Sequence, residues 1–187
     1  VLDKGTLVLG LDESFPPMGY RDSKTGEVVG FDIDLAKEVA TRLGVELVIQ
    51  PINWDAKELE LNGKNIDLIW NGMSITEERT ANMFLSKPYI ANAQIIIVPE
   101  GSDIKTADDM EGKKIGVMQG FTGDLNCTEQ FGEDSVVRFN KSAEAVMALQ
   151  QGKIDCIVID NEPAKKIIEA NKGPVSYTHL TLPTTPY

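Results

Sequence analysis

The chain has 187 residues, of which 42% are hydrophobic and 25% charged, a composition typical of a folded protein of one domain or two small lobes. Its formal net charge of −11 argues against a nucleic acid or an anionic membrane surface as partner, because both are polyanions. No apolar run is long enough to cross a bilayer, and no signal-peptide pattern opens the sequence. Because Val1 is not a methionine, we expect the numbered chain to begin after a signal peptide has been removed or after trimming.

The first half of the chain alternates short apolar runs with amphipathic segments. The run 6–12 predicts a buried strand, and apolar residues at helical spacing over 31–44 predict a helix. The segment between them contains two prolines and a glycine turn, so we expect a loop. A strand over 46–52, a short helix over 54–63 and a strand over 66–70 complete a pattern that predicts a parallel sheet with helices on its faces.

The same alternation starts again after residue 92, with 86–94 as the expected crossover. The second series predicts strands over 93–100, 113–119, 135–139 and 154–160, and helices over 106–112, 121–131, 142–152 and 162–173. The sequence therefore predicts an α/β protein of two lobes, 1–92 and 93–174.

Residues 61–69 resemble residues 149–157, since each stretch contains a helix end, a Gly-Lys turn and an Ile-Asp pair before a buried strand. Glycine is common at any helix-to-strand connection, so the likeness alone indicates little. Both strands end in polar residues, Asn71 and Ser74 in one lobe and Asp160 in the other. Ligands of open α/β sheets bind at this edge, so we expect the functional site there.

Arg79 lies in the segment NGMSITEER, where Thr76 is the expected cap of a short helix. Ser74 and the free amides of the first turn would favour an anion, and the Arg79 guanidinium can grip a carboxylate through two parallel hydrogen bonds. The alternative is a surface ion pair of Arg79 with Glu77 or Glu78, which contributes little to stability. The residues alone leave both interpretations open.

Aromatic and acidic side chains supply further candidates. Phe15 follows the first strand and Trp54 opens a helix after the second, so either ring could cover the apolar part of a small ligand, although core packing is the common role of a single aromatic. Asp12 and Asp160 each follow an apolar strand and could pair with a cation such as an ammonium group. Asp160 could instead cap the helix that follows it.

The segment GVMQGFTGD has the shape of an anion-binding turn, with Gly120 and Thr122 between a strand and a helix. It lacks the Gly-Lys-Ser/Thr of a nucleotide-binding loop and the closing glutamate of a calcium loop, so neither ligand is predicted. Cys127 and Cys156 either form one disulfide or are separate buried thiols. His179 is the only histidine, which argues against a histidine-dependent catalytic or metal site; we expect no metal and no cofactor.

Residues 175–187, VSYTHLTLPTTPY, are rich in threonine and proline and do not continue the preceding pattern. The run VSYTHLTLPT resembles a translated adapter of the kind used in sequencing libraries. We therefore expect the natural sequence to stop near Pro174 and exclude 175–187 from the predicted fold. A natural threonine-rich linker is the alternative.

The segments GFDIDLAKEVATRLG, WDAKELELNGKNIDLIWNGMSITEER, FLSKPY, GKKIGVMQG and QGKIDCIVIDNEPA occur in an order and spacing that resemble the bacterial extracellular solute-binding proteins of family 3, over about residues 5–174. These are the amino-acid receptors of ABC importers. The resemblance implies a two-lobed periplasmic-binding-protein-like (type II) fold, each lobe a mainly parallel sheet flanked by helices, that closes on one amino acid in the cleft between the lobes. It also implies that the chain is truncated and lacks the C-terminal segment that returns to the first lobe, which would leave apolar surface exposed there.

The resemblance also implies roles for individual residues. Arg79 would bind the ligand α-carboxylate, Asp160 in the opposite lobe would bind the α-ammonium, and Phe15 would stack on the ligand. Phe121 departs from the small polar residue usual in the turn that grips the carboxylate, which implies a different side-chain pocket. The full set of implied ligand-binding residues is Asp12, Phe15, Trp54, Asn71, Gly72, Ser74, Arg79, Gly120, Phe121, Thr122 and Asp160.

The function implied is that of a monomeric, non-enzymatic binding protein, located outside the cytoplasmic membrane, either free in the periplasm or lipid-anchored. Its partners would be a small-molecule amino acid and an ABC transporter permease, with no nucleic acid. One alternative is the extracellular sensor domain of a larger receptor. A second is a dehydratase on the same fold, for which Glu13 and Glu129 are the nearest candidate general acids.

Overall fold

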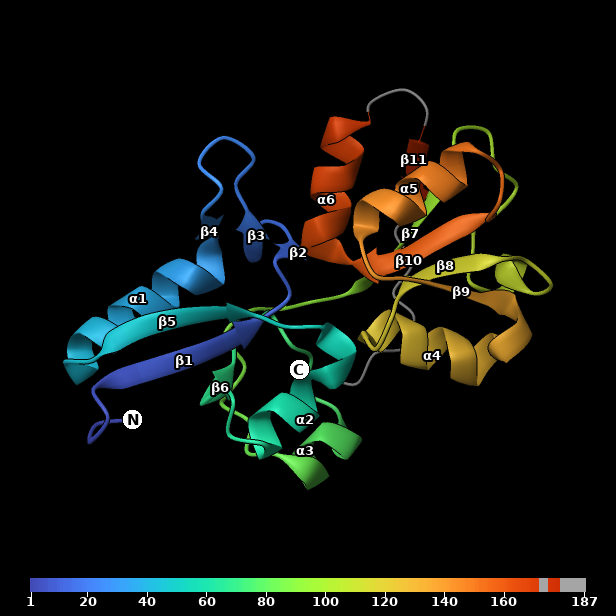
Figure 1. Cartoon of the computed structure of the whole chain (residues 1–187). Helices are drawn as coiled ribbons and strands as arrows, with labels where there is room; N and C mark the ends of the chain where they lie inside the picture. The colour runs from blue at the N-terminus through green and yellow to red at the C-terminus, as the bar shows by residue number, and fades with distance from the viewer. Residues whose placement is uncertain (172–174, 179–187) are drawn as a thin grey trace. The chain divides into compact units, whose positions relative to one another are not determined.

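The computed structural model describes residues 1–171 and the backbone of 175–178, and the chain divides into two compact units between Met73 and Ser74 (Figure 1). This boundary lies earlier in the sequence than residue 92, and the lobe assignments 1–92 and 93–174 stay predictions. Within the described residues, no helix has the length and apolar character needed to cross a membrane.

The first unit is built on a parallel sheet of three strands in the order β5-β1-β6. Helix α1 packs on this sheet, and its residues Ile33 and Ala36 join Leu9 and Leu11 of β1 in the buried core. The predicted strands and helices of this half are confirmed, as β1 (Thr6–Leu11), α1 (Phe31–Leu43), β5 (Glu46–Pro51), the 3-10 turn η1 (Trp54–Ala56) with α2 (Lys57–Asn62), and β6 (Leu68–Ile69).

The segment predicted as a loop after β1 contains three short strands instead. β2 (Ser14–Phe15), β3 (Gly19–Arg21) and β4 (Val28–Val29) pair in an antiparallel sheet. Strands of two or three residues are too short for an apolar–polar alternation, so the sequence pattern does not reveal them. Gly19 lies close to the core in this sheet, because a Cβ there would lie 2.5 Å from the Cδ1 of Leu11, whose side chain would have to move.

The second unit contains a sheet in the order β11-β7-β10-β8-β9, in which β8, β9 and β10 run parallel and β7 runs antiparallel to β10 (Figure 1). Helix α4 covers one face of the sheet and α5 and α6 cover the other (Figure 1). The elements are α3 (Glu77–Asn82), β7 (Gln94–Pro99), η2 (Asp108–Met110), β8 (Ile115–Met118), α4 (Thr122–Phe131), η3 (Glu133–Ser135), β9 (Val136–Phe139), α5 (Ser142–Gln150), β10 (Cys156–Asp160), α6 (Asn161–Ala170) and β11 (Val175–Thr178).

Two predictions for this unit differ from the structure. The helix expected over 106–112 is only the 3-10 turn η2, because Gly112 ends the segment before a stable helical run can form. The segment excluded from the fold, 175–187, supplies strand β11 over Val175–Thr178, which pairs antiparallel with β7. The edge of β7 offers backbone groups to any extended segment, so no apolar pattern is needed for this pairing. Residues 179–187, including His179, lie outside the described residues.

Cys127 and Cys156 are free thiols in the core between α4 and the sheet. Burial raises the pKa of each thiol to about 12. Neither cysteine is therefore available as a thiolate near neutral pH. Of the two alternatives, a disulfide or separate buried thiols, the structure has the separate thiols.

Candidate ligand-binding site

Arg79 is an interior residue of the second unit, only 3% exposed. Thr76 caps helix α3 as predicted, its hydroxyl accepting the Arg79 amide at 3.2 Å. The Arg79 guanidinium donates from Nη1 to the Ser74 carbonyl at 2.9 Å and from Nη2 to the Gly120 carbonyl at 3.3 Å. Glu77 and Glu78 are exposed, so a surface ion pair does not describe this buried side chain.

The turn between β8 and α4 presents backbone amides beside this guanidinium. Gly120 has a φ of +72°, a left-handed conformation that favours glycine, and Phe121 occupies the N-cap position of α4. In the part of the chain that the structure describes, the amides of Thr122 and Gly123 donate no hydrogen bond. Free first-turn amides and a guanidinium are together suited to bind a carboxylate.

Asp160 ends strand β10 and is 5% exposed. It occupies the N-cap position of α6, but its side chain makes no capping hydrogen bond, so the capping alternative does not explain it. Instead its Oδ1 accepts hydrogen bonds from Asn92 Nδ2 and from Gln94 Nε2, the latter at 2.7 Å. Both of these side-chain hydrogen bonds go to Oδ1, and neither uses Oδ2.

Burial raises the pKa of the Asp160 carboxyl above its ordinary value. The two amide hydrogen bonds, and to a smaller extent the charge of Arg79, act in the opposite direction. Arg79 and Asp160 therefore interact electrostatically within the second unit, and each carries a charge that is costly to keep away from water. A ligand with one negative and one positive group would complement both.

Asn92 and Gln94 are site residues that sequence reasoning missed. Gln94 opens β7 directly opposite Asp160 of β10 and is fully buried. A glutamine at the start of an apolar strand was the available signal, because a buried amide needs a partner. This signal identifies Asp160 as the partner of Gln94 only once the antiparallel pairing of β7 with β10 is known, and the sequence did not predict that pairing.

In the first unit, Asp12 and Asn71 lie at the ends of neighbouring strands, as predicted. The Asp12 amide donates to Asn71 Oδ1 at 2.9 Å, and the Asp12 carboxylate accepts from the Ser14 amide and hydroxyl, each at 2.8 Å. Asn71 is 1% exposed, and its Nδ2 has no hydrogen-bond partner among the described residues. A buried, unpaired donor beside a carboxylate indicates room for a polar ligand group.

Phe15, Gly72 and Trp54 complete the expected residues of the first unit. Gly72 has a φ of +57°, and a Cβ there would lie 3.6 Å from the Phe15 ring, so the two residues are neighbours. Trp54 is buried, and the Lys57 ammonium lies 5.2 Å from the centre of its ring. Both rings are as buried as core residues, so burial alone does not separate a ligand-stacking role from packing.

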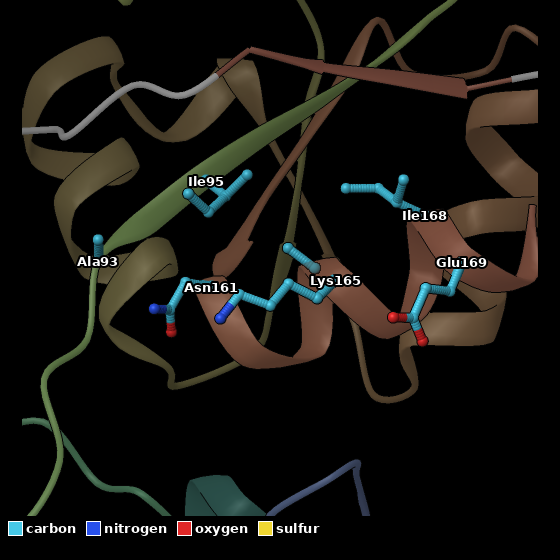
Figure 2. Close-up of a pocket in the computed structure, with 7 residues that line it drawn as sticks. Ala93, Ile95, Asn161, Lys165, Ile168 and Glu169 are labelled. Atoms are coloured by element: carbon cyan, nitrogen blue, oxygen red, sulfur yellow. The ribbon is translucent and has the colours of Figure 1, made fainter. Parts of the chain in front are cut away.

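A pocket of about 410 Å³ lies along β7 and α6 (Figure 2). Its lining contains none of the expected ligand residues. Side chains alternate across a strand, so Ile95, which lines the pocket, lies on the opposite face of β7 from Gln94 and its partner Asp160. The pocket is therefore separate from the charged groups described above; it is lined by Ala93, Ile95, Asn161, Ala164, Lys165, Ile168 and Glu169.

The two acids considered for an enzyme, Glu13 and Glu129, both have solvent-accessible side chains. Glu13 forms an ion pair with Arg21 on the surface, and Glu129 is exposed on α4. Neither residue is buried.

Comparisons with known proteins identify the family of the chain. A sequence profile of the bacterial extracellular solute-binding proteins, family 3, matches residues 7–118. The L-cystine-binding protein TcyJ of Escherichia coli is 30% identical over 180 residues, which cover 95% of this chain and 67% of that protein. The ABC transporter glutamine-binding protein GlnH of Bacillus subtilis is 32% identical over 177 residues, covering 92% of this chain and 65% of that protein.

A solved structure, the arginine-bound form of truncated ArgBP from T. maritima, superposes with a TM-score of 0.91 at 38% identity and covers 100% of this chain and 87% of that chain. The fold is thus the two-lobed α/β fold of periplasmic binding proteins, as predicted. The chain belongs to family 3 of the bacterial extracellular solute-binding proteins. It spans about two thirds of the length of these curated relatives.

Proposed function

We propose that this protein binds a free amino acid as a zwitterion and delivers it to an ABC importer. The observation that carries the proposal is the presence of a buried cation, Arg79, and a buried carboxylate, Asp160, in one unit. A free amino acid has a carboxylate and an ammonium on the same carbon, so it complements both charges at once. A ligand carboxylate and a ligand ammonium would each bring an opposite charge to one of these buried groups.

The α-carboxylate is assigned to Arg79 and to the amides of Thr122 and Gly123. The α-ammonium is assigned to Asp160, whose Oδ1 is held by Asn92 and Gln94. Each charge-assisted hydrogen bond in a water-excluded site contributes roughly 1.5 to 3 kcal/mol. Loss of one such bond should therefore raise the dissociation constant by roughly 10- to 150-fold.

The side chain of the amino acid is assigned to the residues of the first unit that offer a carboxylate, an unpaired amide donor and aromatic rings: Asp12, Asn71, Phe15 and Trp54. L-Arginine is the first candidate, because its guanidinium suits a carboxylate and an aromatic face. The 38% identity to an arginine-bound structure supports the same choice. L-Cystine, L-histidine and L-glutamine follow, since relatives are named for them.

We further propose that the protein acts as a monomer outside the cytoplasmic membrane, either free in the periplasm or held by a lipid anchor. Its macromolecular partner is the permease of an ABC transporter. The membership of an extracellular family and the ABC-transporter name of one relative support this assignment.

The test is isothermal titration of the 187-residue chain with the common L-amino acids and L-cystine, after circular dichroism has shown that the sample is folded. We expect saturable, one-to-one binding of at least one amino acid, with L-arginine among the tightest. A folded sample that binds none of them contradicts the proposal. Binding of carboxylic acids without an α-ammonium, at equal affinity, would also contradict it.

A further inference from the structure

Asp124 is a buried acid that connects three parts of the second unit. It is the third residue of α4 and is 5% exposed. Its Oδ2 accepts the Gly120 amide at 2.9 Å, which ties the turn before the helix to the helix itself. Its Oδ1 accepts from the Thr128 hydroxyl at 3.2 Å and from Arg138 Nε of β9 at 2.9 Å.

Gly120 is held from both sides of its backbone. Its amide donates to Asp124, and its carbonyl accepts from the Arg79 guanidinium. Its left-handed φ of +72° places these two groups in one tight turn. The position of Arg79 relative to the free amides of Thr122 and Gly123 therefore depends on the hydrogen bond that Asp124 makes.

The charge of Asp124 is compensated by Arg138 of β9. Arg138 Nε lies 2.9 and 3.0 Å from the two carboxylate oxygens, and its Nη atoms pair with Glu133, the Nη2 contact being 3.0 Å. An uncompensated carboxylate next to an anion site would repel a ligand carboxylate. The Arg138 pair lets Asp124 hold the turn without presenting a free negative charge to it.

We propose that Asp124 is a positioning residue for ligand binding, which holds the 119–122 turn in the conformation that receives the ligand carboxylate, and that Arg138 orients its carboxylate. This inference rests on the proposed function of Arg79 and the turn. The competing role is purely structural, a buried ion pair that joins α4 to β9. A structural role predicts that any loss of Asp124 affects all ligands alike, through stability.

The first experiment compares Asp124→Ala and Asp124→Asn by titration with L-arginine and with agmatine, its decarboxylated analogue, or with L-histidine and histamine if histidine binds more tightly. Asp124→Ala should weaken amino-acid binding by at least about 10-fold. Asp124→Asn keeps a carbonyl acceptor for the Gly120 amide, so its affinity for the amino acid should lie within about 3-fold of that of the unchanged chain. Glu133→Gln, which loses only the exposed partner of Arg138, is the matched control and should bind normally.

The decarboxylated amine separates the two roles. Its binding does not use the turn, so Asp124→Ala should leave its affinity unchanged within about 3-fold. Equal losses for the amino acid and the amine, or equal losses in the alanine and asparagine variants, overturn the proposal. Normal amino-acid binding by Asp124→Ala overturns it as well.

A second experiment needs no ligand and distinguishes this inference from the proposed function. In the unliganded chain, the Gly120 amide should be protected from hydrogen exchange. The protection should fall at least 10-fold in Asp124→Ala and should be retained in Asp124→Asn. Protection that is unchanged in Asp124→Ala overturns the positioning role. If the Gly120 amide shows the expected protection but no amino acid binds, the proposed function is wrong, whereas the hydrogen bond between Asp124 and Gly120 is supported.

Discussion

Arg79 and Asp160 are the two buried charged residues on which the proposed binding site depends. Arg79 donates to the carbonyls of Ser74 and Gly120, Asp160 accepts from the amides of Asn92 and Gln94, and the two charges also interact with each other. Neutral dipoles offset part of the cost of burying a charge but not all of it. A ligand that brings the opposite charges removes the remaining cost, which is why these two positions should dominate affinity.

Replacing Arg79 by lysine tests whether the shape of the guanidinium matters beyond its charge. Lysine keeps the positive charge but loses the planar fork, so it cannot serve the Ser74 and Gly120 carbonyls and a carboxylate together. We expect L-arginine to bind Arg79→Lys at least about 10-fold more weakly, measured by titration calorimetry. Arg42→Lys, on the exposed face of α1, is the control and should bind normally.

Asp160 should make binding sensitive to pH. Its carboxyl pKa is raised by burial, so on acidification it becomes neutral at a higher pH than an ordinary aspartate. A neutral Asp160 attracts an ammonium far less, so affinity should fall as the pH is lowered through the raised pKa of this carboxyl. Asp160→Asn should bind weakly at every pH and lose this dependence. An unchanged pH profile in the variant would show that another group titrates.

The same shift predicts an effect on stability. Because the folded-state pKa lies above the unfolded value, the folded chain holds this proton more tightly. The resulting stabilisation is fully present below the unfolded pKa and is lost as the pH rises through the folded pKa. Without ligand, Asp160→Asn should therefore melt at a higher temperature than the unchanged chain at pH 7 but not at low pH. A lower melting temperature at pH 7 would contradict the assignment.

Sequence reasoning singled out the charged residues Arg79 and Asp160, which are buried, but not the two amides that hold Asp160. Arg79 was recognisable because it follows a predicted helix cap and a glycine-containing turn. Asn92 and Gln94 were not recognisable, because their role follows from the position of Gln94 opposite Asp160 in the sheet, 66 residues away in sequence. Local patterns carry no information about such a partner.

At the scale of elements, the packing of α4 against β7 and β10 is close at one point. A Cβ at Gly123 would lie 2.9 Å from Gln94 Oε1 and 3.2 Å from the backbone carbonyl of Val158. The first turn of α4 can therefore approach the strands that hold Asp160 only if this residue is glycine. The turn and the Asp160 carboxylate are thus placed by the same contact.

Replacing Gly123 by alanine should displace the Gln94 amide and lower affinity. We expect a loss of about 1 to 3 kcal/mol in the free energy of unfolding from overpacking. We also expect L-arginine to bind about 3- to 10-fold more weakly, since one hydrogen bond to Asp160 is disturbed. Gly116→Ala, whose Cβ would lie 2.5 Å from Ile154 Cδ1, is the matched control. It should lose stability but keep its affinity; equal loss of affinity in both variants would assign the effect to general destabilisation.

Elements with a clear apolar period were predicted well, and short ones were not. The 13 residues of α1 and the six of β1 carry enough positions to define a period. Strand β2 has two residues and η2 has three, so tertiary pairing rather than local pattern decides their structure. Strand β11 was missed because backbone pairing with β7 requires no apolar side chains.

At the scale of the whole molecule, the chain carries two sets of polar residues, one in each compact unit. Asp12 and Asn71 form one set, and Arg79 and Asp160 belong to the other. The two-lobed class was predicted from the repeated alternation of strands and helices together with the family resemblance. The assignment of 1–92 and 93–174 to the lobes stays a prediction, because the compact units divide at residue 73 instead.

The central claim is that Arg79 binds the carboxylate of a free amino acid, and one titration experiment tests it most directly. L-Arginine and agmatine are titrated into the unchanged chain and into Arg79→Ala. We predict that the unchanged chain binds L-arginine at least about 10-fold more tightly than agmatine, and that Arg79→Ala removes this preference without weakening agmatine. If Arg79→Ala weakens both compounds equally, or if the unchanged chain does not distinguish them, the claim is wrong.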